Sequence, residues 1–138
     1  MAGVFPDAEW LQGFKDYLNS NETYARVARK WEGDLVFEIQ ADGPLTEDQI
    51  VYLDLWHGKC SDASIVPSLE GKDPAFVLTA PYGNFKKVMT GELDAMQAML
   101  TRKLKVKGSM GYMMANVPTV LEFVKCAKDA TDKVLGDE

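Results

Sequence analysis

One stretch of the chain changes periodicity within a few residues: KLKVKGSM, at positions 103–110. Lysines alternate there with Leu104 and Val106, which predicts a half-exposed strand over 103–108, because successive side chains of a strand point to opposite faces. Ser109 follows as a good N-cap for a short helix to Ala115. A strand that leads directly into a helix is therefore the unit from which we interpret the rest of the chain.

Four further segments have the pattern of strands. Apolar and polar residues alternate over 34–40 and 50–57, and Gly58 provides a turn into a third strand that ends near 65–66. The stretch 75–80 completes the set after a polar connection. With 103–108, these segments predict five strands, most of them antiparallel.

Helical spacing of apolar residues surrounds these strands. We expect helices over 7–18, 21–32, 93–100 and 119–135, and a short helix or irregular turn over 81–90. Strands gathered in the middle of the chain with helices around them predict the α+β class. We expect a single domain over 1–138, with a helical leader over 7–32.

Composition narrows the possible functions. The chain has 138 residues, 46% of them hydrophobic, and a formal net charge of −6. No apolar run reaches the roughly 18 to 20 residues of a membrane-spanning helix. The N-terminal residues do not resemble a secretory signal, so we expect a cytoplasmic protein. An acidic chain is repelled by the phosphate backbone of nucleic acid, so we expect no nucleic-acid partner.

Methionine is concentrated in one part of the chain, since six of the seven lie between Met89 and Met114. One group shares a helical face with Leu100, and a second group follows Ser109. Two interpretations stay open: a plain core, or the adaptable wall of an apolar pocket, because methionine is unbranched and fills irregular space. The run Tyr112-Met113-Met114 favours a helix that is covered on nearly all sides.

The alternating lysines also have two interpretations. The segment 86–107 has six positive and two negative residues, a net charge of +4, so the rest of the chain carries −10. Lys103, Lys105 and Lys107 are either a solvated face that discourages edge-to-edge pairing, or a contact for anionic head groups, coenzyme A phosphates or a membrane surface.

Cysteine and histidine offer little chemistry. Cys60 and Cys126 are too far apart in the sequence for a disulfide framework and are typical of small buried hydrophobic residues. His57 and Cys60 form an H-x-x-C pair, which is too few ligands for zinc. A nucleophilic Cys-His pair at this place would make the protein a small enzyme. We expect no catalytic residues, no metal site and no cofactor.

Two motifs resemble the sterol carrier protein 2 (SCP-2) family. They are GELD at 91–94 and KLKVKGSM at 103–110, and GDLVF at 33–37 and YLDL at 52–55 look like the first two strands of that family. The likeness spans about 32–134. Glu92, Ala95 and Arg102 depart from it, since they stand where the family commonly has Lys, Pro and Gly.

The resemblance implies a five-stranded, mostly antiparallel sheet, covered on one face by helices that enclose an apolar tunnel. It also implies non-catalytic binding and transfer of a fatty acid, a fatty acyl-CoA or a sterol-like lipid. The leader over 7–32 is longer than in the minimal domain and would cover or narrow the tunnel. The residues expected to line the tunnel are Phe85, Val88, Met89, Met96, Met99, Leu100, Met110, Met113, Met114, Val120, Leu121 and Val124.

An alternative function belongs to another class. The protein would be an accessory or interaction module of an enzyme that handles hydrophobic substrates, and its pocket would be vestigial. The sequence indicates no oligomeric state.

Overall fold

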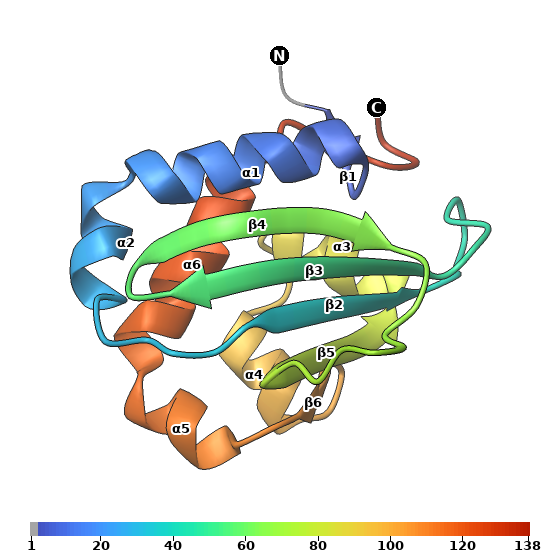
Figure 1. Cartoon of the computed structure of the whole chain (residues 1–138). Coiled ribbons are helices and arrows are strands. Elements are labelled where there is room, and N and C mark those ends of the chain that lie inside the picture. The colour runs from blue at the N-terminus through green and yellow to red at the C-terminus, as the bar shows by residue number, and fades with distance from the viewer. Residues whose placement is uncertain (1–2) are drawn as a thin grey trace.

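The main sheet has five strands, and helices cover one of its faces (Figure 1). A computed structural model describes residues 3–138. The strand order is β4-β3-β2-β5-β6, and only the β2–β5 pair of this sheet is parallel. The predicted α+β class and the mostly antiparallel sheet are therefore confirmed. The strands are β2 (Leu35–Gln40), β3 (Gln49–Trp56), β4 (Lys59–Val66), β5 (Phe76–Pro81) and β6 (Lys105–Lys107).

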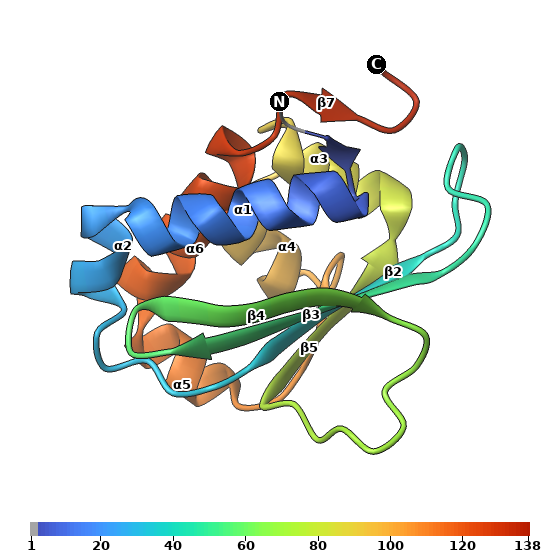
Figure 2. The same ribbon diagram turned by 45° about the horizontal axis from the view of Figure 1, so that its top comes forward.

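The helices lie behind and along one edge of the sheet. In Figure 2, α1 runs along β4 and crosses in front of α6, and α4 lies behind α1. Asp7, Asp94 and Ser109 cap α1, α4 and α5 by accepting a backbone N–H with their side chains. The helices are α1 (Ala8–Ser20), α2 (Glu22–Val27), α3 (Tyr82–Met89), α4 (Ala95–Leu100), α5 (Met110–Ala115) and α6 (Val117–Asp129).

Alternation along β2 decides which side chains face the helices. Leu35, Phe37 and Ile39 are buried on the inner face. Phe37 pairs with Val51 of β3 on one side and with Leu78 of β5 on the other. The inner face of the three central strands is therefore continuously apolar, and the core lies between this face and the helices.

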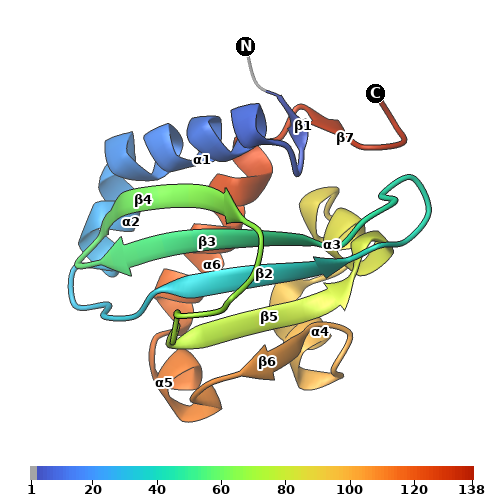
Figure 3. The same ribbon diagram turned by 45° about the vertical axis from the view of Figure 1, so that its right-hand side comes forward.

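The loop over 67–75 carries the chain from β4 across the outer face of the sheet to β5 (Figure 3). Asp34 anchors the end of the loop, because its carboxylate accepts the Ala75 N–H at 2.7 Å and the Tyr52 hydroxyl at 2.8 Å. The Lys72 ammonium lies 4.4 Å from the centre of the Tyr52 ring. This crossover is what allows β5 to pair in parallel with β2.

Two predicted helices are shorter than expected. The helix expected over 21–32 ends at Val27, and Trp31 then turns inward, where its indole N–H donates to the Gly33 carbonyl at 2.8 Å. The helix expected over 119–135 begins two residues earlier and ends at Asp129. Thr131 stops it by donating to the Ala127 carbonyl and accepting the Trp10 indole N–H.

A second, two-stranded sheet joins the ends of the chain. β1 (Val4–Phe5) and β7 (Lys133–Val134) pair in parallel, and Tyr82 donates its hydroxyl to the Leu135 carbonyl at 2.7 Å. Sequence patterning did not predict either strand. Over residues 3–138, no helix is both long enough and apolar enough to cross a bilayer.

Candidate functional site

An apolar cavity of about 50 Å³ lies between the inner face of the sheet and the helices. Thr119 supplies an aliphatic hydroxyl to its lining, and this hydroxyl is already engaged, since it donates to the Val27 carbonyl at 2.7 Å. The cavity therefore offers shape and apolar contact. It is lined by Tyr24, Trp31, Leu35, Phe37, Leu55, Leu78, Phe85, Val88, Met89, Ala95, Met99, Leu104, Met113, Thr119, Val120, Phe123, Val124 and Ala127.

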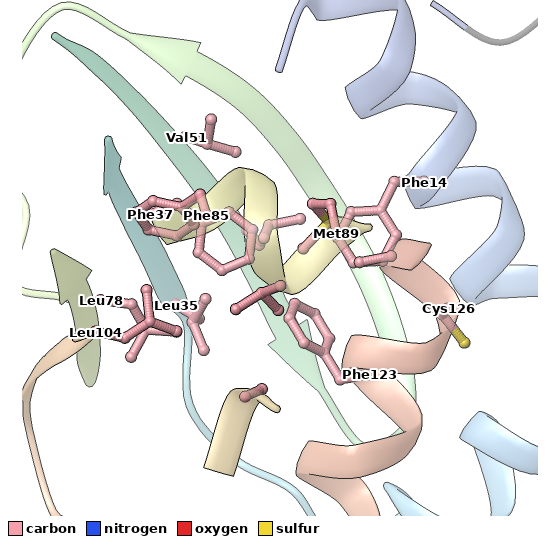
Figure 4. Close-up of a cluster of buried hydrophobic side chains, with 14 of the residues drawn as sticks. Phe14, Leu35, Phe37, Val51, Leu78, Phe85, Met89, Leu104, Phe123 and Cys126 are labelled. Atoms are coloured by element: carbon pink, nitrogen blue, oxygen red, sulfur yellow. The ribbon is translucent and has the colours of Figure 1, made fainter. Parts of the chain in front are cut away.

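Aromatic rings from the sheet, α3 and α6 converge on this space (Figure 4). The ring centre of Phe37 lies 5.6 Å from that of Phe85 and 6.1 Å from that of Phe123. Phe123 also lies 5.2 Å from Phe14 of α1. These tilted and edge-on contacts fill most of the interior and leave only a narrow gap.

The cavity is far smaller than a typical ligand pocket, which occupies about 300 to 1,000 Å³. A long-chain ligand would therefore have to displace side chains in the wall. Met89, Met99 and Met113 belong to that wall. Their unbranched chains can change rotamer more easily than branched residues, so this part of the wall is the easiest to rearrange.

The structure brings seven of the twelve predicted tunnel residues around the cavity. Met113 is the most completely buried of the three methionines among them, at 1% exposure. All seven come from the helical side of the core. They are Phe85, Val88, Met89, Met99, Met113, Val120 and Val124.

The other five predicted residues do not line this cavity. Met96 and Met110 are half-buried and pack against the core elsewhere. Leu100, Met114 and Leu121 are 56%, 47% and 45% exposed. Helices α4 and α5 present only one face to the interior, and adjacent residues on a helix point about 100° apart.

The expectation that α5 is covered on nearly all sides is therefore wrong. Met113 points inward while Met114 faces solvent. Tyr112 is half-buried, and its hydroxyl accepts the backbone N–H of Glu32 at 3.0 Å. The three consecutive bulky residues therefore lie in three different environments: half-buried for Tyr112, buried for Met113 and exposed for Met114.

Sequence reasoning missed the floor of the cavity. Five lining residues on this side were not expected. Four come from the inner face of the sheet, namely Leu35, Phe37, Leu55 and Leu78, and the fifth is Leu104, just before β6. Alternation over 34–40 and 50–57 puts Leu35 and Phe37 on one face of their strand and Leu55 on one face of the next. Nothing in that pattern distinguishes a side chain that fills the core from one that borders a cavity.

Lys105 and Lys107 lie on the edge strand β6, whereas Lys103 precedes it, since the strand expected over 103–108 spans only Lys105–Lys107. Lys103, Lys105 and Lys107 are exposed, whereas Leu104 is buried. Gly108 follows them at a φ of 130°, a conformation that other residues rarely adopt. Within the described part of the chain, none of the three lysines has an ion-pair partner within 4 Å.

A groove of about 440 Å³ lies outside the cavity, between the α3–α4 connection and α6. Val88, Ala95 and Val124 line both the groove and the cavity. These three side chains are thus the wall between the two spaces. The remaining groove residues are Gly91, Leu93, Asp94, Leu121, Lys125, Lys128 and Asp129.

The cysteines are buried and free, as expected. Burial raises the pKa of Cys60 to about 11 and that of Cys126 to about 12. Both thiols are therefore protonated near neutral pH, and Cys60 lacks the thiolate that a nucleophile needs. The His57 ring nitrogen lies 2.6 Å from the Glu32 carboxylate at the surface. No group of three or more His, Cys, Asp or Glu suited to a metal ion occurs among residues 3–138.

Comparison with solved structures identifies close similarities in fold. A crystal structure of sterol carrier protein 2 aligns with a TM-score of 0.79 at 29% identity, over 87% of this chain and 94% of that one. A solution structure of a possible sterol carrier protein from Thermus thermophilus aligns with a TM-score of 0.82 at 27% identity, over 95% and 93%. Sterol carrier protein 2 from Yarrowia lipolytica shares the fold, with a TM-score of 0.58 at 20% identity over 94% and 97%.

Comparison of the sequence gave two results. A search of curated proteins found no significant match. The model of the SCP-2 sterol transfer family matches residues 14–120, well over half of the chain. This match includes both motifs that carried the resemblance, at 91–94 and 103–110. The chain therefore belongs to the SCP-2 sterol transfer family.

Proposed function

We propose that the protein binds and transfers one lipid at a time, with the apolar part of the lipid held in the cavity. The lipid is a fatty acid, a fatty acyl-CoA or a sterol-like molecule. The observation that carries this proposal is the cavity itself, which is enclosed between the sheet and helices and lined almost wholly by apolar side chains. The family and the 29% identity to a sterol carrier protein 2 support it.

Binding requires the cavity to expand from its 50 Å³. Burial of a methylene group contributes about 0.8 kcal/mol, so a chain of about twelve carbons gains on the order of 9 kcal/mol before costs. Rearranging methionine and phenylalanine side chains costs part of this. We therefore expect long chains to bind more tightly than short ones. The free-energy cost of expanding the cavity is incurred once, whereas each added methylene contributes further binding free energy.

A direct test starts with protein purified without detergent. Native mass spectrometry should show a co-purified lipid of defined mass, and dodecanoate should displace a fluorescent fatty acid from the protein. A protein that carries no lipid and ignores fatty acids, acyl-CoAs and sterols alike would contradict the proposal.

A cavity-filling variant tests the location of the ligand. Val120 is 8% exposed and lines the cavity, so Val120→Phe occupies space that the lipid needs. We expect at least tenfold weaker binding with little change in stability. Val66→Phe is the matched control, because Val66 is half-buried at the end of β4 and does not line the cavity. Equal affinities in both variants would place the ligand elsewhere.

The small cavity also favours a second candidate, an accessory or interaction module of an enzyme that handles hydrophobic substrates. Leu100, Met114 and Leu121 are exposed apolar side chains available to a partner protein. Under this candidate, the protein forms a tight complex and binds no lipid. The mass-spectrometry experiment distinguishes the two functions.

We further propose that Lys103, Lys105 and Lys107 contact anionic head groups at a membrane surface. Lys105 and Lys107 lie on the edge strand β6, Lys103 lies two residues before it, and all three are exposed. Flotation with phosphatidylserine vesicles should recover the protein at low salt, and replacing all three lysines by glutamate should abolish recovery. Recovery of the triple variant would contradict this contact.

A further inference from the structure

We propose that a fatty acid reaches the cavity through the groove between the α3–α4 connection and α6, and that Lys128 holds its carboxylate at the groove. This inference rests on the proposed function, and it adds a route, an orientation and a class of ligand. The ligand would be a single-chain amphiphile with an anionic head.

A thin wall separates the groove from the cavity. Val88, Ala95 and Val124 line both spaces, so a side-chain movement of one layer connects them. Val88 is 3% exposed and Ala95 is 5% exposed, whereas Val124 is only partly buried. No side chain shared by the two linings is bulkier than valine.

A short helix lies on one side of this wall. Ala95 begins α4, which has six residues, and a helix of this length has little stability of its own. Gly91, at a φ of 84°, lies in the connection that leads to it. On the other side, α6 has thirteen residues and packs against the core through Phe123 and Ala127. We therefore expect α4, and not α6, to move when the wall opens.

The charged side chains of the groove differ in whether they already have a partner. Lys125 is paired with Asp129 at 2.9 Å, and Asp129 also accepts the Tyr17 hydroxyl at 3.1 Å. Asp94 is occupied as the cap of α4, where it accepts the Gln97 N–H at 3.0 Å. Lys128 has no ion-pair partner within 4 Å among residues 3–138. It is thus the groove cation that remains available to a ligand carboxylate.

An apolar side chain lies beside this cation in the groove. Leu121 lines the groove and is 45% exposed, so its side chain is accessible to an apolar chain. A chain whose carboxylate meets Lys128 would cover Leu121 and then pass Val124 into the cavity. The polar rim and the apolar passage therefore match the two ends of a fatty acid.

The test compares two ligands that differ only in the head group, dodecanoate and dodecanol, by calorimetric titration. Lys128→Glu replaces an attraction with a repulsion, and we expect about fivefold weaker binding of dodecanoate and no change for dodecanol. Lys128→Gln should show a smaller loss in the same direction. Lys59→Glu is the control with the same change of charge, at the exposed start of β4 outside the groove.

Each other outcome overturns a specific statement. If Lys128→Glu leaves dodecanoate binding unchanged, or weakens both ligands equally, the head group does not meet Lys128. If Lys59→Glu weakens dodecanoate to the same extent, the effect is one of net charge, and the groove assignment is wrong. If the unaltered protein binds neither ligand, the proposed function itself fails.

Discussion

Arg102 has a backbone conformation that its side chain does not favour. Its φ is 62°, in the left-handed region, at a position where the SCP-2 family commonly has glycine. This conformation costs a residue with a Cβ about 1 to 2 kcal/mol, whereas glycine adopts the region freely. The turn between α4 and the strand therefore stores strain in this chain.

We predict that Arg102→Gly raises the free energy of unfolding by about 0.5 to 1 kcal/mol, because relief of strain exceeds the added entropy of glycine in the unfolded chain. Urea denaturation measures the difference. Arg102→Ala is the matched control, since it removes the charge and keeps the Cβ. The prediction is wrong if the alanine variant is as stable as the glycine variant.

Phe123 connects the two sides of the core. It is 7% exposed, lines the cavity, and contacts the rings of Phe14 and Phe37. We predict that Phe123→Ala lowers the free energy of unfolding by about 3 to 5 kcal/mol. Because the enlarged cavity offers room, dodecanoate should recover more thermal stability in this variant than in the unaltered protein. A loss below about 1 kcal/mol would show that neighbouring side chains collapse into the space.

At the scale of elements, β6 depends on how closely Gly108 approaches β5. A Cβ at Gly108 would lie 2.4 Å from the Ala75 carbonyl oxygen and 2.7 Å from a ring carbon of Phe76. Any side chain there would push the end of β6 away from the sheet. The junction between β6 and α5 therefore requires glycine.

Gly108→Ala should lower the free energy of unfolding by about 2 kcal/mol or more, since it adds both strain and a clash. The control is Gly13→Ala in α1, where a Cβ would meet nothing within 4 Å. That substitution should raise stability by up to about 1 kcal/mol, because alanine is the better helix former. Paired urea denaturation curves with the same sign would contradict the interpretation.

Prediction from sequence succeeded where an element has a clear period. Alternation identified the strands at 34–40, 50–57 and 103–108, and Ser109 marked the start of α5. The turn at Gly58 and the polar connection after it located the other two strands of the main sheet. β1 and β7 have two residues each, which is too short for any period. Their pairing depends on contacts between the two ends of the chain, which no local pattern contains.

The candidate site could be predicted only in part, for a physical reason. The resemblance places Met113 and Val120 in the tunnel wall, but it does not fix how far each helix is rotated toward the sheet. It therefore also places Leu100 and Leu121 there, although both are exposed. Residues of β2 reach the cavity from the opposite side. Their contribution depends on the packing distance between layers, which the sequence does not encode locally.

For the whole molecule, buried hydroxyl and thiol groups make stability sensitive to alkaline pH. Burial raises the pKa of Cys60 to about 11, that of Cys126 to about 12 and that of Tyr82 to about 12. Their ordinary values are 9.0 for the thiols and 10.0 for the phenol. In this range the unfolded chain releases protons that the folded chain retains, so stability falls as pH rises.

Below about pH 8, these three groups are protonated in both the folded and the unfolded chain, so they do not affect the free energy of unfolding. We predict that the free energy of unfolding declines steadily between about pH 9 and pH 12. Urea denaturation at successive pH values measures the slope. Cys126→Ala removes one group and should make the decline shallower. An unchanged slope in that variant would mean that Cys126 does not contribute.

The parallel pairing of β2 with β5 has a consequence for the order in which the sheet is assembled. β3 and β4 follow β2 along the chain and can form a local antiparallel unit with it, whereas β5 arrives only after the 67–75 loop has crossed the outer face. Until then, β2 is an edge with free backbone N–H and C=O groups and an apolar inner face. Closing this long-range contact is the slow type of step in folding. Partly folded chains are therefore most exposed to self-association along the strand that later becomes the centre of the sheet.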